Sequence, residues 1–199
     1  GNAELLADSE PIASDPAQVR GIAKGMRRAA ARLAHLVRSY VLYLELDSVQ
    51  AAPERRSALR DERLALNGQE IEVLLRGVAR EFGREEDLRV EISPAVLKMS
   101  ESVFFTLLEE LADEAFRRSR LGNAVEVRGK ELTNAYHLAI SSRGGTDPAA
   151  LLLSQTEETP LGFLLARRIV EIYGGELEIQ DSQDGLTRVG VYLPCVLPT

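Results

Sequence analysis

The 199-residue sequence is poor in residues that bind metals or form disulfides: it has one cysteine and two histidines. Cys195 has no partner for an intramolecular disulfide, and these side chains are too few for a structural zinc site. The composition indicates a reducing, cytosolic setting. No apolar run reaches the roughly 18 residues that a membrane-spanning helix needs, and residues 1–6 lack the basic and apolar parts of a signal peptide. We therefore expect no membrane contact in these residues.

Positive charge is also in short supply. The chain has 24 Lys and Arg against 31 Asp and Glu, for a formal net charge of -7. Such a chain has no general attraction for nucleic acid or anionic lipid, so nucleic acid is not an expected partner. The length suits one domain with an appendage. The sequence opens without methionine on a segment that is predicted to be helical, and we expect it to belong to a longer protein.

The first strong pattern lies in residues 18–46, where apolar residues recur at alternating spacings of four and three. The repeating positions are Ile22, Met26, Ala29, Leu33, Leu36, Tyr40 and Tyr43. This spacing is typical of a coiled-coil seam, and further apolar residues widen the stripe as in a helical bundle. We expect the seam to form a homodimer. Residues 1–7 would be the end of a hairpin partner helix, and residues 8–16 the loop between the two.

The rest of the chain alternates between helical and strand patterns after a charged connector. The predicted order is a helix over 70–82, a strand over 88–92, a helix over 100–119, strands over 124–128 and 135–141, a helix over 161–173, and strands over 176–180 and 187–193. This order predicts an α+β fold, a two-layer sandwich of a mixed β-sheet with helices on one face, preceded by the long helix. The expected boundaries are 1–50 for the helical part, 51–67 for the connector and 68–199 for the sandwich.

Three segments carry a resemblance to two-component sensor histidine kinases. Residues 108–119 resemble the asparagine box, Glu-Leu-x-x-Asn-Ala-x-Lys-x-Ser, with Glu114 in place of the asparagine and Arg117 in place of the lysine. Residues 162–179 look very like the second glycine box and its helix, and residues 184–194 are similar to the closing Gly-x-Gly-Thr hairpin. Residues 27–47 also resemble the second helix of the family's dimerisation hairpin. The resemblance covers residues 68–194 well and implies the family's ATPase-type domain.

The nucleotide motifs depart from the family pattern at several positions. The family's Asp-x-Gly-x-Gly turn, whose aspartate binds adenine, reads Ser142-Arg143-Gly144-Gly145-Thr146 here. Pro160 and Leu186 replace glycines of the other two motifs, and the expected lid, residues 147–159, is short. Loss of the aspartate alone removes a charge-assisted hydrogen bond of about 1.5 to 3 kcal/mol. We therefore expect no cofactor, with ATP and Mg²⁺ as the alternative if the site is still competent.

The resemblance assigns a degenerate ATP site to seven positions, with Glu114 as the Mg²⁺ ligand if a metal binds. These positions are Glu110, Glu114, Arg117, Ser142, Gly144, Gly162 and Thr187. A second interpretation remains open for the arginines at 117, 118 and 120, which would also suit the C-terminal end of a helix.

Three functions follow from the resemblance. The first is a pseudokinase that dimerises through its hairpin and acts by protein contacts, with a response-regulator receiver domain as the implied partner. The second is an active histidine kinase in which Glu114 replaces the asparagine. The third is an ATP-independent phosphotransferase of a phosphorelay, whose acceptor histidine would lie upstream of Gly1. His35 lies on the second hairpin helix and His137 in a strand, so packing roles are expected for both.

Overall fold

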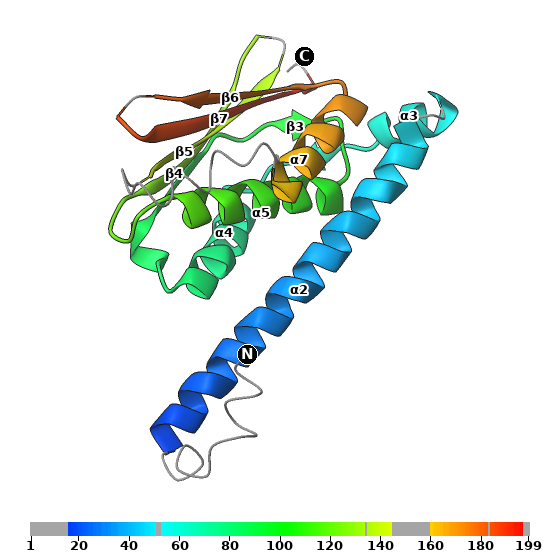
Figure 1. The fold of residues 1–199 in the computed structure, drawn as a ribbon. Helices are drawn as coiled ribbons and strands as arrows, with labels where there is room; N and C mark the ends of the chain where they lie inside the picture. Colours follow the sequence, from blue (N-terminus) through cyan, green and yellow to red (C-terminus); the bar gives the residue numbers. More distant parts are fainter. Residues whose placement is uncertain (1–15, 51–52, 134, 145–159, 183, 197–199) are drawn as a thin grey trace. The chain divides into compact units, whose positions relative to one another are not determined.

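The computed structural model describes residues 16–50, 53–133, 135–144, 160–182 and 184–196 (Figure 1). The expected hairpin end at residues 1–7, the loop after it up to residue 15, Gly145, Thr146 and the expected lid lie outside these residues. The chain divides into two compact units, residues 1–41 and 42–199. Among the described residues, no helix combines the length and the apolar character that crossing a membrane requires.

Unit 2 is built on a five-stranded mixed sheet. Its strands, in spatial order, are β2 (Leu88–Ile92), β4 (Val125–Glu131), β5 (Tyr136–Arg143), β7 (Leu186–Leu193) and β6 (Glu176–Asp181). Strand β2 runs parallel to β4, and all other neighbours are antiparallel. Each predicted strand is present, and the sequence pattern placed its ends to within a few residues.

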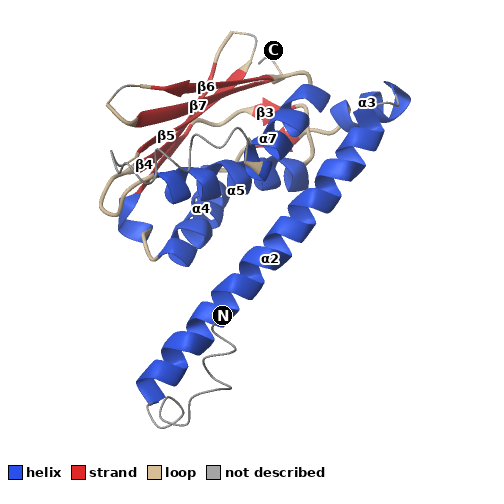
Figure 2. Ribbon diagram, viewed as in Figure 1, coloured by secondary structure: helices blue, strands red, loops and turns tan. Residues whose placement is uncertain are grey.

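Three helices cover one face of this sheet and leave the other face open (Figure 2). They are α4 (Gly68–Phe82), α5 (Glu101–Arg118) and α7 (Leu161–Ile172). Side chains alternate along β5, so that Leu138 and Ile140 are buried beneath the helices whereas His137 and Ala139 face outward. The predicted α+β sandwich with helices on one face is confirmed.

Local signals explain where these helices begin and end. The Asn67 side chain accepts a hydrogen bond from the Gln69 amide at the start of α4, and Gly83 ends the helix with φ 68°. Gly174, with φ 75°, follows α7 at the predicted stop. Ser100, where the predicted helix begins, is the residue before α5; its side chain makes no capping hydrogen bond, and its hydroxyl lies 3.4 Å from the Tyr173 hydroxyl.

The segment between the long helix and α4 contains structure that the periodicity did not predict. It holds a short helix, α3 (Pro53–Arg60), and strand β1 (Leu64–Ala65), which pairs antiparallel with β3 (Val96–Leu97). Leu64 joins the buried core. Arg60 donates to the Ile172 carbonyl at 2.6 Å, which satisfies an acceptor that the end of α7 leaves without a partner inside the helix.

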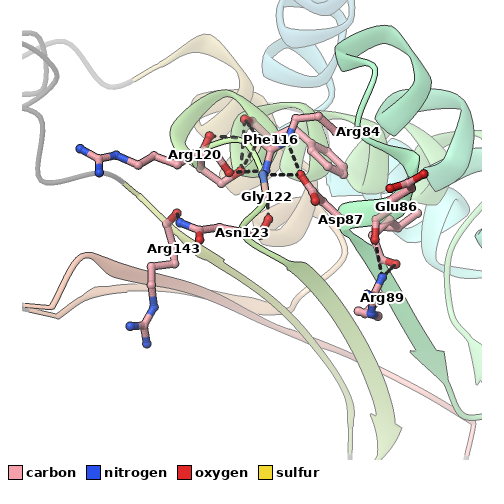
Figure 3. Close-up of polar contacts among 11 residues, drawn as sticks. Arg84, Glu86, Asp87, Arg89, Phe116, Arg120, Gly122, Asn123 and Arg143 are labelled. Atoms are coloured by element: carbon pink, nitrogen blue, oxygen red, sulfur yellow. Dashed lines mark hydrogen bonds and ion pairs between the residues drawn. The ribbon is translucent and has the colours of Figure 1, made fainter.

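A buried arginine holds the far end of α5 in place (Figure 3). Arg84 follows α4, is 6% exposed and donates to the carboxylate of Asp87, which lies in the 3-10 turn η2 (Glu85–Asp87), at 2.7 Å. Its two terminal nitrogens donate to the carbonyls of four residues around the end of α5, and one of them also donates to the Ser119 hydroxyl. The four carbonyls belong to Phe116, Ser119, Arg120 and Asn123. We call these residues the Arg84 cluster.

The long helix α2 (Pro16–Gln50) extends from unit 1 into unit 2. In unit 1, the predicted seam residues from Met26 to Tyr40 face solvent, with Leu33 63% and Tyr40 54% exposed. In the part of α2 that belongs to unit 2, Leu46 is 4% exposed and Leu42 and Tyr43 pack against the core, whereas Leu44 is 50% exposed. The Asp47 carboxylate accepts a hydrogen bond from Arg168 of α7 at 2.8 Å.

Candidate functional site

Helix α5 carries the acidic residues of the candidate site. Glu110 and Glu114 lie one turn apart and are both buried, at 5% and 7% exposed. Buried carboxylates require charged or hydrogen-bonding partners, because an isolated charge in the protein interior is strongly destabilising. The partners of these two glutamates therefore decide what the site can bind.

The Glu114 carboxylate is engaged by the arginines that follow it on the same helix. Arg118 donates from Nε to Glu114 Oε1 at 2.7 Å, and Arg117 Nε lies 3.8 Å from Oε2. Arg117, which occupies the box lysine position, also donates to Asp113. These contacts form an ion-pair group of spacing i to i+3 and i to i+4 on one face of the helix.

Arg118 contacts an aromatic ring of the neighbouring helix as well. Its guanidinium carbon lies 5.0 Å from the centroid of the Phe163 ring, in the range of a cation–π contact. Phe163 lies in the first turn of α7, within the segment that resembles the second glycine box. The Arg118 side chain therefore links the asparagine-box position to the glycine-box helix.

The start of α7 packs tightly against α5. A Cβ atom added at Gly162 would lie 2.9 Å from Glu110 Oε2 and 3.6 Å from the Glu110 carbonyl oxygen. Pro160, which precedes the helix, has no N–H group and provides no side-chain cap. A side chain at position 162 would therefore press on the Glu110 carboxylate, and this end of α7 has one backbone donor fewer than a glycine at position 160 would give.

The other predicted site residues lie at the end of β5 and on β7. Ser142 is 3% exposed and is the cross-strand partner of Thr187. The Thr187 hydroxyl donates to the Asp181 carboxylate at 2.6 Å. Gly144 bridges to Ser119 after α5, and its amide donates to the Gly185 carbonyl at 2.8 Å. Gly144 therefore joins β5, the end of α5 and the β6–β7 turn.

The structure brings the predicted residues together in two groups. Glu110, Glu114, Arg117 and Gly162 lie along α5 and its contact with α7, whereas Ser142, Gly144 and Thr187 lie at the paired ends of β5 and β7. The end of α5 connects the groups through the bridge between Ser119 and Gly144. The Arg84 cluster fixes this same end of the helix, and Asn123 of the cluster donates to the Arg143 carbonyl at 3.0 Å (Figure 3).

Sequence reasoning missed Phe163 and the role of Arg118 as the direct partner of Glu114. The spacing of four residues between Glu114 and Arg118 is a signal that could have predicted their pairing. No comparable signal points to Phe163, because its contact depends on how α7 packs against α5.

His137 and Cys195, which belong to unit 2, lie away from these groups. The His137 ring stacks on Tyr192, with centroids 4.6 Å apart. Burial and the nearby Lys130 charge lower the pKa of His137, whereas Glu178 opposes this shift. Cys195 is buried, and burial raises the pKa of its thiol. The packing role expected for His137 agrees with its stacked ring.

The fold is similar to that of several solved histidine kinase structures. The mycobacterial sensor histidine kinase MprB is 22% identical, with a TM-score of 0.53 over 67% of this chain and 98% of that chain. The Acinetobacter baumannii histidine kinase AdeS is 14% identical, with a TM-score of 0.62 over 90% of this chain and 85% of that chain. The catalytic domain of histidine kinase ThkA is 14% identical, with a TM-score of 0.52 over 67% and 97%.

The chain has the histidine kinase fold. The sequence resemblance predicted this architecture, and the solved structures confirm it. No family model matches the chain, and no curated protein is similar to it in sequence. Helix α5 carries the segment that resembles the asparagine box, and α7 carries the segment that resembles the second glycine box.

Proposed function

We propose that this chain is a pseudokinase module of a two-component signalling protein, which dimerises and acts through protein contacts without transferring phosphate from ATP. The observation that carries the proposal is the link from Glu114 through Arg118 to Phe163. Glu114 occupies the position at which the resemblance places the metal-binding oxygen. Arg118 of the same chain supplies the cation that pairs with it.

The energetics of this link oppose Mg²⁺ and nucleotide. A metal at Glu114 would have to replace a charge-assisted hydrogen bond worth about 1.5 to 3 kcal/mol and separate Arg118 from the Phe163 ring. Without the metal, the Glu114 and Glu110 carboxylates would repel a triphosphate. Ser142 in place of the adenine-binding aspartate and Pro160 in place of a glycine remove further contacts. These residues therefore fit ATP and Mg²⁺ poorly.

The exposed stripe on α2 supports the dimeric part of the proposal. Leu33, Leu36 and Tyr40 are 63%, 41% and 54% exposed at alternating coiled-coil spacings. Burial of such side chains against a second copy would stabilise a dimer by about 25 cal/mol per Å² of apolar surface. A cytosolic setting and a response-regulator receiver domain as partner follow from the resemblance to two-component kinases and belong to this proposal.

One observation favours the active kinase as a second candidate. Glu114 places a carboxylate where the family has an asparagine oxygen, and carboxylates are good ligands for Mg²⁺. If Arg118 moved away, Glu114 could hold the metal of an ATP complex. Nucleotide titration separates this candidate from the pseudokinase.

The experiment is calorimetric titration of the full chain with millimolar ATP and Mg²⁺, with thermal unfolding measured alongside. We expect no saturable Mg²⁺-dependent heat and no rise in the unfolding midpoint. Glu114→Ala is compared with Glu101→Ala, which removes an exposed carboxylate from the first turn of the same helix. Saturable, Mg²⁺-dependent binding that Glu114→Ala weakens and Glu101→Ala leaves unchanged would overturn the pseudokinase proposal in favour of the active kinase.

Dimerisation is tested by sedimentation equilibrium of the full chain. We expect a dimer for the natural sequence and a shift to monomer for Leu33→Glu, which places a charge in the seam. Arg38→Glu is the matched control, since Arg38 is exposed on α2 outside the predicted seam. The assignment of the seam would be contradicted if the unmodified chain were a monomer, or if Leu33→Glu and Arg38→Glu dissociated the dimer to the same extent.

A further inference from the structure

The open face of the main sheet carries a hollow of about 620 Å³. Much of its lining comes from outward-facing side chains of β4, β5 and β7, including Arg128, Lys130, His137, Ser141, Arg143 and Arg188. Helices α4, α5 and α7 cover the opposite face (Figure 2). The hollow is therefore separated by the sheet from the site around Glu114.

The pairing register explains why the sheet is hollow here. Ala139 lies in the middle of the face, opposite Arg128 on β4 and Gly190 on β7. Ser141, the next outward-facing residue of β5, lies opposite Arg188. Small side chains thus form the floor, and long cationic side chains rise on both sides. Ser141 also lies opposite Glu126 on β4, so Arg188 faces Glu126 across β5 at a strand separation of about 10 Å, and Lys130 lies four residues further along β4, opposite His137.

The lining of the hollow carries an excess of positive charge, whereas the whole chain is negatively charged. It includes four Lys or Arg side chains and two glutamates, Glu91 and Glu126, in a chain of net charge -7. Arg128 is held by both glutamates, with its nitrogens 3.1 Å from Glu126 and 3.6 Å from Glu91. Arg143 lies 3.3 Å from Asp184, which lies in the β6–β7 turn.

Two cations of the lining are left for an external ligand. In the part of the chain that the structure describes, neither Lys130 nor Arg188 forms an ion pair. Both side chains are exposed. Lys130 lies opposite His137, whose ring stacks on Tyr192 and gives that end of the hollow a rigid wall.

We propose that this hollow binds a small polyanion that carries phosphate groups, with Lys130 and Arg188 as its charged contacts at the two ends of the hollow and the Ser141 hydroxyl as a donor beside Arg188. The volume lies within the range of about 300 to 1,000 Å³ that is typical of small-molecule sites. Arginine presents a planar fork of N–H groups that matches phosphate oxygens, and lysine adds a point charge. This site is distinct from the ion-pair group around Glu114, which lies on the helix-covered side of the sheet, and it shares only Ser142 with the predicted ATP-site residues.

Inorganic triphosphate is the probe, titrated into the full chain without Mg²⁺ and at constant ionic strength set with sodium chloride. We expect saturable heat and a rise in the thermal midpoint. Lys130→Gln and Arg188→Gln each weaken binding about tenfold or more, as loss of a charge-assisted hydrogen bond predicts. Arg76→Gln is the matched control: Arg76 lies on α4, where its side chain pairs with Glu72, and its loss should leave binding unchanged.

Three outcomes would overturn the assignment. The first is a response no larger than that of the sodium chloride control, and the second is equal weakening by Arg76→Gln. The third is tighter binding of a hexaglutamate peptide than of triphosphate, which would make the face a protein-docking surface. Glu114→Ala separates this test from the ATP experiment, because binding in the hollow should be independent of both Mg²⁺ and Glu114.

Discussion

Replacement of Arg84 by methionine tests how the end of α5 is held in place. Arg84 is 6% exposed and donates to the Asp87 carboxylate and to acceptors of four residues near this helix end. Methionine retains much of the aliphatic volume but no donor. Arg84→Met therefore leaves buried carbonyl groups and the Asp87 carboxylate without their partner, while disturbing the packing little.

The expected loss of stability follows from these orphaned acceptors. Each buried acceptor left without a donor costs about 1 to 3 kcal/mol where water cannot reach it. Removal of one partner of a buried ion pair costs about 3 to 5 kcal/mol in measured cases. Because some carbonyls gain water in the variant, we expect a loss of about 4 kcal/mol in the free energy of unfolding. For a domain of this size that loss lowers the thermal midpoint by about 8 to 16 °C.

Urea unfolding followed by circular dichroism, together with calorimetric melting, measures this change. Arg80→Met is the matched control, because Arg80 is 71% exposed and forms a surface ion pair with Glu85. Such a pair contributes about 1 kcal/mol or less. Arg84→Lys should recover only part of the loss, since one ammonium group cannot replace a five-donor fork. Equal losses of stability in Arg84→Met and Arg80→Met would contradict a stabilising role for the Arg84 cluster.

Three further predictions concern stability. The Arg84 hydrogen bond holds the pKa of Asp87 below its ordinary value although burial opposes this, so its stabilisation is present above about pH 4 and is lost as pH falls through the lowered pKa. Urea unfolding of Asp87→Asn across acid pH should therefore show a flatter dependence. Gly175→Ala should lower the free energy of unfolding by about 1 to 3 kcal/mol, because the added Cβ would collide with the Tyr192 carbonyl oxygen, and calorimetric melting measures this loss. Arg60→Gln removes the 2.6 Å hydrogen bond to the Ile172 carbonyl and should lower the free energy of unfolding by about 1 kcal/mol in urea titration. An unchanged free energy would show that this hydrogen bond contributes nothing beyond what water supplies.

Much of the fold could be predicted from the sequence because its signals are local. The period of α5, the alternation along β2 and the glycine after α7 each depend on residues within a few positions of one another. Strands β1 and β3 could not be predicted in this way, since each has two residues and depends on pairing with distant segments: β1 with β3, and β3 also with residues around Cys195.

In the candidate site, too, some features follow from local sequence signals and others depend on contacts between distant residues. The sequence placed Glu114 and Arg117 at motif positions, and it predicted that Ser142 and Pro160 depart from the family pattern. The contact between Arg118 and Phe163 joins two helices that are far apart in the chain, and no local pattern specifies it. The Arg84 cluster is a similar case, because its acceptors are backbone carbonyls that carry no signature in the sequence.

By itself, the sequence determined the order of helices and strands, the apolar stripe of α2 and the positions at which the nucleotide motifs change. Those properties depend on side-chain type and near-neighbour spacing, which the chain carries before it folds. Only the tertiary structure decided that Arg118, which donates to the Glu114 carboxylate, also contacts the Phe163 ring, and that Lys130 and Arg188 line the same hollow of the sheet. Strand order and helix packing bring these residues together, and both depend on contacts between distant parts of the chain.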